Sequence, residues 1–443
     1  MRPPTRKLRR IKTSFCSHLL AVCIGAYLMS MLTLVLERDG CFEMVNREGR
    51  LGLGPTKENY PSPRQTKKLN STGEQVDFTT NFSFPSRDLR IKYYMGDWFN
   101  RTLQPNDIPC NEIHGREKVH DSDSAIMWNV GPLEKYVKSH KDWKTDAYLK
   151  DSLQVLAANI SLAASDVDRR MILVLGDTHS KSNRLPAVAK TRFSRFAIPK
   201  KSGKPFFNTI IWPLSINRHH NPVDEYLKLK TEGKVCKWED KKSSSIWRGG
   251  VTGILSDKLL VKNYPNGGWR IQVVKNYFHK NISDVDIAFK KGDGTLTWAP
   301  SKYKDVKGFV RDSHISMSDQ LKYKYIVTME GNDVATSLKW QLASNSVVFM
   351  ARPICVSFAM EDLLVPFVHY VPLNDDYSNL IEMVKWARKN DAKCRWIAEQ
   401  ATQFMEKYWI SEEAKKDYIL IQQELGEIYH KQFGEAIKSC ARK

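Results

Sequence analysis

The sequence contains no C-x-x-C pair. Its eight cysteines are scattered along the chain, with Cys16 and Cys23 in an apolar segment and the other six after it. Scattered cysteines argue against a zinc site. In an oxidising compartment the six later cysteines can form up to three disulfides, whose pairing the spacing leaves open.

Charged residues are absent from Thr13 to Leu36, a stretch long enough to cross a bilayer. Six Lys and Arg side chains lie in the twelve residues before it. This asymmetry predicts a cytoplasmic tail at 1–13, a transmembrane signal anchor at 14–36 and a lumenal body. We therefore expect a single-pass type II protein of the Golgi or endoplasmic reticulum membrane. The N-x-S/T acceptors that fit a glycosylated lumenal body are Asn70, Asn81, Asn100 and Asn281.

No nucleic-acid-binding motif is visible, although the net charge is +20. The charge outside the N-terminal cluster is spread over a large body. Such a distribution suits small anionic ligands, for example nucleotide phosphates, or acidic glycans. We therefore do not expect nucleic acid as a partner.

Internal repeats and long low-complexity tracts are also missing. Residues 37–88 are rich in Gly, Pro, Ser, Thr and charge, which predicts a stem. From about 90 onward, strand-like and helix-like segments alternate, which is typical of parallel sheets with crossover helices. We predict two such domains, 89–235 and 236–409, facing a cleft, and a C-terminal helix at 410–443.

The predicted strands and helices follow from apolar runs and their periodicity. Helices are expected at 149–164, 269–279, 334–344, 378–389, 391–409 and 411–437, with a capping box at Ser316–Asp319. Strands are expected at 171–175, 208–212, 244–247, 285–289, 325–329, 347–350 and 367–371.

Asp177 follows the apolar run Met171 to Leu175, which predicts a strand buried on both faces. Open α/β sheets place their ligands at the carboxyl edge of such strands. Asp177 is therefore a candidate catalytic acid or base, and His179 is close enough in sequence to line an acceptor site.

Two further strand ends lead into glycine-containing turns. The first carries Arg248 and Gly249, and glycine lets a backbone approach a phosphate while arginine binds phosphate oxygens. The second turn leads into a predicted helix, whose N-terminus favours anions. Its candidate donor-binding residues are Glu330, Asn332, Thr336, Ser337 and Lys339.

In this order, the three segments resemble glycosyltransferase family 90, the family of capsule-associated-protein-like domains and Rumi-type protein O-glucosyltransferases. The resemblance runs from about Arg170 to Trp409 and is strongest from Lys322 to Asn390, which contains Val368–Pro372. I-W-P-L at 211–214 and W-R-G-G at 247–250 fit the same spacing.

The resemblance implies a GT-B fold of two Rossmann-like domains, the first for the acceptor and the second for a nucleotide sugar. It implies Asp177 as general base and Arg248 as a phosphate contact. Where animal members carry a second arginine on the helix, this chain has Ser337, with Lys339 two residues later. The E-G-N-D turn is more similar to bacterial, fungal and protist members. Trp212, Arg270 and Glu361 are further candidates for the cleft.

The expected activity is inverting, metal-independent transfer of a glucose- or xylose-type sugar from a UDP-sugar to a hydroxyl of a protein or glycan. The UDP-sugar is a substrate, and no cofactor is expected.

Three alternatives stay open at this point. A GT-A transferase would need a D-x-D metal site, for which 121–123, 166–168 and 284–286 are candidates. A Golgi sulfotransferase is suggested by the basic loop Pro199–Lys204, although Pro205 disfavours the helix that should follow. A non-catalytic lumenal glycan-binding protein would use its tryptophans to stack on sugars.

Overall fold

The computed structural model describes most of the chain after residue 83. The described ranges are 84–114, 125–129, 170–174, 184–194, 209–213, 219–253, 269–279, 284–291, 304–311 and 315–440. The predicted tail, the anchor at 14–36, Asp177 and the predicted helix at 149–164 lie outside them. Within these ranges no helix is both long and apolar enough for a membrane crossing.

The first sheet is mixed and has the order β1-β2-β3-β4-β6. Only β2 and β3 pair antiparallel, whereas the other neighbours pair parallel. The four apolar residues Met171 to Val174 are buried, which confirms the prediction of a strand that is buried on both faces. The strands are β1 (Ile113–His114), β2 (Ala125–Asn129), β3 (Arg170–Val174), β4 (Val188–Ala189) and β6 (Ile210–Ile211).

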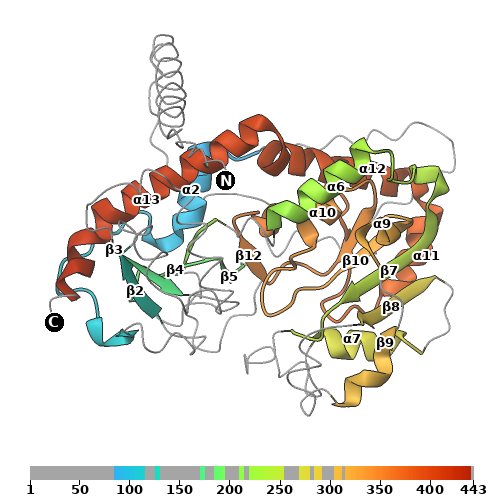
Figure 1. The fold of residues 1–443 in the computed structure, drawn as a ribbon, viewed down its shortest axis with the longest axis horizontal. Coiled ribbons are helices and arrows are strands. Elements are labelled where there is room, and N and C mark those ends of the chain that lie inside the picture. Colours follow the sequence, from blue (N-terminus) through green and yellow to red (C-terminus); the bar gives the residue numbers. More distant parts are fainter. Residues whose placement is uncertain are drawn as a thin grey trace, which may run out of the picture. The chain divides into compact units, whose positions relative to one another are not determined.

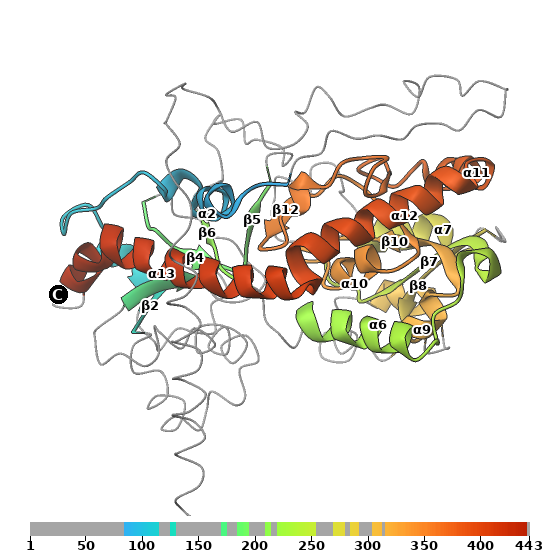
Figure 2. The ribbon, with the colours of Figure 1, turned by 90° about the horizontal axis from the view of Figure 1, so that it is seen from above.

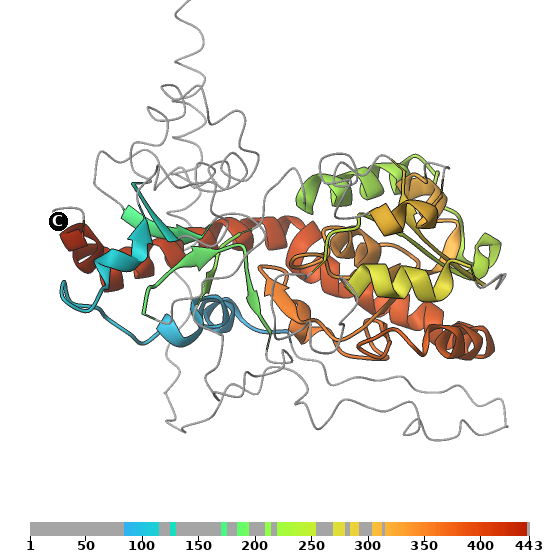
Figure 3. The same cartoon turned by 90° about the horizontal axis from the view of Figure 1, so that it is seen from below.

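The second sheet is entirely parallel, with the order β13-β11-β10-β7-β8-β9. Ile246, Ile326 and Val348 belong to one core cluster, whereas Trp247 and Phe349 belong to another. Alternate residues of these strands thus face opposite sides, and helices cover both (Figure 2, Figure 3). The strands are β7 (Lys242–Gly249), β8 (Val285–Lys290), β9 (Val310–Arg311), β10 (Tyr323–Thr328), β11 (Val347–Met350) and β13 (Val371–Pro372).

The helices of the two cores are largely those the sequence predicts (Figure 1). The Ser316 capping box is present, because the Ser316 hydroxyl accepts from Asp319 N and the Asp319 carboxylate accepts from Ser316 N. The helices are α2 (Arg87–Met95), α6 (Asn221–Thr231), α7 (Trp269–Tyr277), α9 (Met317–Gln320), α10 (Leu338–Ala343), α11 (Leu380–Lys389), α12 (Asp391–Met405) and α13 (Glu412–Cys440).

Two predicted elements differ from the structure. The helix expected from Val334 begins only at Leu338, because the preceding residues form turns in which Leu338 N donates to Ala335 O. The strand expected from Phe367 is a turn up to Tyr370. There Phe367 has a φ of 58°, and Val365 N donates to Nδ1 of His369. His369 is therefore a buried packing residue that closes this turn.

A small antiparallel ladder connects segments far apart in sequence. β5 (Thr191–Phe193) pairs with β12 (Cys355–Ser357), and Ser194 N donates to Ile354 O at 2.7 Å. The long helix α13 packs on β3, where the Tyr429 hydroxyl accepts from Ile172 N at 3.0 Å and donates to Pro186 O at 2.9 Å. These contacts hold the segments around the first sheet against those that follow the second.

One disulfide forms among the described cysteines, between Cys110 and Cys440. It joins residues 330 positions apart, so it attaches the end of α13 to the segment before β1. Cys236 and Cys394 are thiols, and Cys41 lies outside the described residues.

We predict that Cys110→Ser lowers the free energy of unfolding by about 2–4 kcal/mol, because a cross-link that closes a long loop removes much entropy from the unfolded chain. Urea denaturation with and without reductant measures this loss. Cys236→Ser is the matched control and should unfold like the parent chain. Equal stability of the parent with and without reductant would contradict the prediction.

Candidate functional site

The candidate site lies where three neighbouring parallel strands end. β10 pairs in parallel with both β7 and β11, so their carboxyl ends meet at one edge of the sheet. β7 continues into Gly250, β10 into the turn from Met329 to Asp333, and β11 into the segment from Ala351. Ligands of open parallel sheets bind at this edge.

Arg270, in the first turn of α7, connects the turns after β7 and β10. Its Nε donates to Glu330 O at 2.9 Å, its Nη2 to Met329 O at 2.8 Å and its Nη1 to Gly250 O at 3.2 Å. The guanidinium also lies over the Trp247 ring, 5.7 Å from its centroid. Arg270 thus fixes the relative position of the two turns that the sequence indicates for the donor.

Packing explains why glycine occupies two positions in and beside these turns. A Cβ on Gly249 would lie 2.4 Å from the ring of Trp247, and one on Gly331 would lie 3.2 Å from Nη2 of Arg270. Gly249 is moreover the last residue of β7 rather than part of the turn. Both glycines therefore make room for the side chains that shape the edge.

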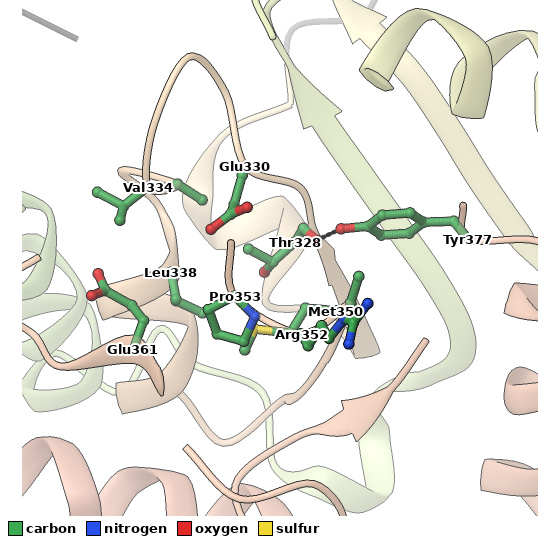
Figure 4. A pocket seen from close by; sticks show the side chains of 11 residues that line it. Thr328, Glu330, Val334, Leu338, Met350, Arg352, Pro353, Glu361 and Tyr377 are labelled. Atoms are coloured by element: carbon green, nitrogen blue, oxygen red, sulfur yellow. Dashed lines mark hydrogen bonds between the residues drawn. The ribbon is translucent and has the colours of Figure 1, made fainter. Parts of the chain in front are cut away.

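A small cavity of about 20 Å³, the space of about one water molecule, opens at the edge beside β10 and β11. In Figure 4 the side chain of Glu330 points toward Pro353 and Leu338, while Glu361 and Tyr377 lie on opposite sides. The Tyr377 hydroxyl donates to Thr328 O at 2.8 Å. The cavity thus lies at the edge between Glu330, Glu361 and Tyr377, with mostly apolar side chains in the rest of its wall.

The Glu330 carboxylate is held against the segment after β11. It accepts from Cys355 N at 2.9 Å and from Ile354 N at 3.1 Å. Burial of the carboxyl is the main cause that raises the pKa of Glu330, to about 8, and the nearby Glu361 and Asp333 charges raise it further. The two N–H groups act in the opposite direction. Near neutral pH this pKa keeps much of Glu330 protonated.

Lys339 and Glu361, both predicted donor or cleft residues, bind each other. The Lys339 ammonium lies 3.1 Å from the Glu361 carboxylate, and their side chains are only 1% and 2% exposed. Glu361 also accepts from Ser357 N at 2.7 Å and from the Ser357 hydroxyl at 2.6 Å. Removing one partner of such a buried pair typically costs about 3–5 kcal/mol, so both have a structural role here.

Arg248 is likewise paired. Its Nη2 donates to both carboxylate oxygens of Asp286, at 2.7 and 2.8 Å. Asp286 also forms an ion pair with Arg311 at 3.1 Å. Asp284, the other acid of that D-x-D candidate, pairs with Arg388. Both acids are thus neutralised by arginines, and the described residues contain no cluster of metal-ligating side chains.

The remaining predicted residues are placed as follows. Thr336 is exposed and Ser337 partly exposed in the turn before α10, and Asn332 is partly exposed in the turn after β10. Trp212 is 5% exposed and belongs to the core. Asn100 is exposed, as a glycosylation site must be. Asp177, His179, Asn70, Asn81 and Asn281 lie outside the described residues.

Sequence reasoning missed two residues at this edge. Lys190, between β4 and β5, forms an ion pair with Asp333 at 2.8 Å, which connects the first sheet to the turn after β10. Arg352 lines the cavity and pairs with Asp375 at 3.0 Å. Arg352 lies two residues after the predicted strand 347–350, a position that could have marked it, whereas nothing in the sequence indicates the partner of Lys190.

Comparisons with known proteins find one matching family model and several similar proteins. Residues 216–427 match the model described as Glycosyl transferase family 90. The O-glucosyltransferase LpsA of Dichelobacter nodosus is 40% identical over 168 residues, which are 38% of this chain and 44% of LpsA. Human Protein O-glucosyltransferase 1 is 27% identical over 168 residues, 38% of each chain. The matched region thus spans less than half of either relative.

Among solved structures, the crystal structure of Anabaena HepE in complex with UDP-glucose aligns over 52% of this chain and 60% of HepE. The TM-score is 0.28 and the sequence identity 10%, a level of similarity that supports no conclusion about the ligand.

The matched region contains the strand ends, both turns, Arg270 and the Lys339–Glu361 pair. Residues 216–427 are therefore similar to glycosyl transferase family 90 and to proteins named as O-glucosyltransferases.

Proposed function

We propose that the protein transfers a glucose- or xylose-type sugar from a UDP-sugar to a hydroxyl of a protein or glycan, with inversion and without a metal. In this proposal the two sheets form the facing domains of a GT-B enzyme. Residues 14–36 anchor it in the Golgi or endoplasmic reticulum membrane with the body in the lumen. Two relatives, LpsA and human Protein O-glucosyltransferase 1, are O-glucosyltransferases, which supports the choice of sugar.

The observation that carries the proposal is the shared edge of β7 and β10, where Arg270 holds two turns together. Backbone N–H groups of such turns can bind a diphosphate. Within the same sheet, Arg248 on β7 and Arg311 on β9 share only one carboxylate, that of Asp286 on β8, and the three side chains together keep one positive charge. Such a positive potential in the sheet favours the leaving diphosphate.

The proposed reaction forms one bond and breaks one. The acceptor oxygen attacks the anomeric carbon of the sugar while the bond from this carbon to the UDP oxygen breaks, and the electron pair leaves with UDP. Asp177, as general base, takes the hydroxyl proton from the acceptor. Attack from the side opposite the leaving group inverts the anomeric configuration.

We predict that Asp177→Asn lowers the rate of transfer by about a hundredfold or more, because the acceptor hydroxyl then lacks its base. UDP release from UDP-glucose and UDP-xylose in the presence of acceptor measures the rate, and calorimetry measures UDP binding, which should not change. Asp107→Asn, on an exposed loop, is the control. Full transfer by Asp177→Asn would refute the assignment of the base.

We expect Arg270→Lys to weaken UDP binding by about tenfold or more, because one ammonium cannot reach three carbonyl oxygens in two turns. Calorimetry with UDP gives the affinity, and a melting curve shows whether the fold is kept. Arg395→Lys on the exposed face of α12 should leave the affinity unchanged. The same affinity for Arg270→Lys and the parent would show that the turns do not bind the donor.

The raised pKa of Glu330 predicts a pH dependence of donor binding. Below about pH 8 the carboxyl is largely neutral, whereas above it a negative charge appears beside the site for a diphosphate. We expect UDP binding to weaken from pH 7 to pH 9, and Glu330→Gln to remove this trend.

The same shift affects stability in a defined direction. Because the folded-state pKa is above the ordinary value of 4.5, the group's contribution is present at low pH and is lost as the pH rises through about 8. An unchanged pH profile of binding and unfolding in Glu330→Gln would contradict both expectations.

A further inference from the structure

A second, larger cavity of about 320 Å³ lies between α6 and α13. Its walls include His220 just before α6, Asp224 on α6, Trp409, and Lys415 and Gln422 on α13. It shares no lining residue with the cavity at the strand edge. Its volume is at the lower end of the range of small-molecule sites in proteins.

One wall of this cavity is formed by the π-helix Glu406–Ile410, which links α12 to α13. π-Helical turns are rare and occur frequently at functional sites. This turn brings the neighbouring side chains of Tyr408 and Trp409 into the wall.

The aromatic side chains of this wall contain polar atoms without partners. Tyr408 and Trp409 are 4% and 6% exposed, yet the Tyr408 hydroxyl and Nε1 of Trp409 make no hydrogen bond within the described part of the chain. The same holds for Nε2 of His220, whose ring stacks on Trp409 with centroids 4.4 Å apart. None of these three atoms is open to the cavity, whereas Gln422, which is only 3% exposed, lines it. A buried amide without a partner typically costs about 1–3 kcal/mol, so a ligand that hydrogen-bonds Gln422 would be favoured here.

The cavity is lined by charged groups of both signs. Asp224 comes from α6 and Lys415 from α13, and Gln422 adds an uncharged amide. The Lys415 ammonium donates to Glu412 at 2.9 Å, which raises the pKa of Lys415, and the Asp224 charge adds to this effect. Charges of both signs suit a neutral ligand with many hydroxyls better than an anion such as a nucleotide.

We propose that this cavity is a second ligand site and that it binds a neutral saccharide of one or two rings. A pyranose has an apolar C–H face for the aromatic wall and hydroxyls for Asp224 and Gln422. An acyl chain would match the apolar walls but would offer no hydrogen bond to the Gln422 amide.

The purpose of the site rests on the proposed function, because a glycosyltransferase that extends glycans could hold part of its acceptor there. The binding itself does not depend on catalysis. His220 and Lys339 also lie within electrostatic range, since the Lys339 charge contributes to lowering the pKa of His220 to about 4, after desolvation. The imidazole is thus neutral and adds no charge to the cavity wall.

Calorimetry of the full chain with maltose, a neutral disaccharide, tests the proposal. We expect binding that Asp224→Ala weakens by about tenfold or more, a loss that corresponds to a hydrogen bond with a charged group. Glu225→Ala is the matched control, because Glu225 is the exposed neighbour on α6 that does not line the cavity. Lys415→Met and Lys416→Met form a second matched pair on α13.

UDP binding, measured on the same samples, should be equal in all four variants. This measurement separates the two proposals. If the protein binds UDP but not maltose, the saccharide site is overturned and the proposed transferase site is not. The proposal is also overturned if Asp224→Ala and Glu225→Ala bind maltose alike, or if decanoate binds with sensitivity to Asp224→Ala while maltose does not bind.

Discussion

The candidate site depends on the contact of one guanidinium with three backbone carbonyls. Arg270 reaches Gly250 after β7 and Met329 and Glu330 after β10, and so sets the distance between two turns that the sheet alone leaves independent. Trp247 supports the guanidinium from below, and Gly249 and Gly331 leave the room that both side chains need. The main effect of Gly249 and Gly331 is thus to leave space for the side chains of Trp247 and Arg270.

Most charges near this edge are compensated within the protein. Lys339 pairs with Glu361, Lys190 with Asp333 and Arg248 with Asp286. Arg248 and Asp286 connect two strands, Lys339 holds the short helix that contains Glu361, and Lys190 connects the first sheet to a turn of the second. Net attraction for a diphosphate therefore depends on the few charges left over and on oriented N–H groups. In this setting the protonation of Glu330 matters, because one more negative charge would reduce that attraction.

Local signals in the sequence predicted the elements well. The apolar run Val347–Met350 is a strand with the predicted ends, and the capping box at Ser316 forms as its spacing indicates. Non-local contacts explain the failures. The turn at 367–370 contains apolar residues that resemble a strand, but the His369 imidazole binds Val365 N and bends the chain. The partners of Lys190, Arg248 and Lys339 are equally invisible in sequence, because tertiary packing brings them together.

The central claim is that the donor diphosphate binds across the two turns that Arg270 joins. Hydrogen–deuterium exchange with and without UDP tests it most directly, because exchange of backbone N–H groups reports on each turn separately. The account predicts that UDP slows exchange in the peptides covering Gly249–Gly253 and Met329–Asp333 together, and that Arg270→Lys abolishes both effects. Protection confined to other segments, or to only one of these turns, would contradict it.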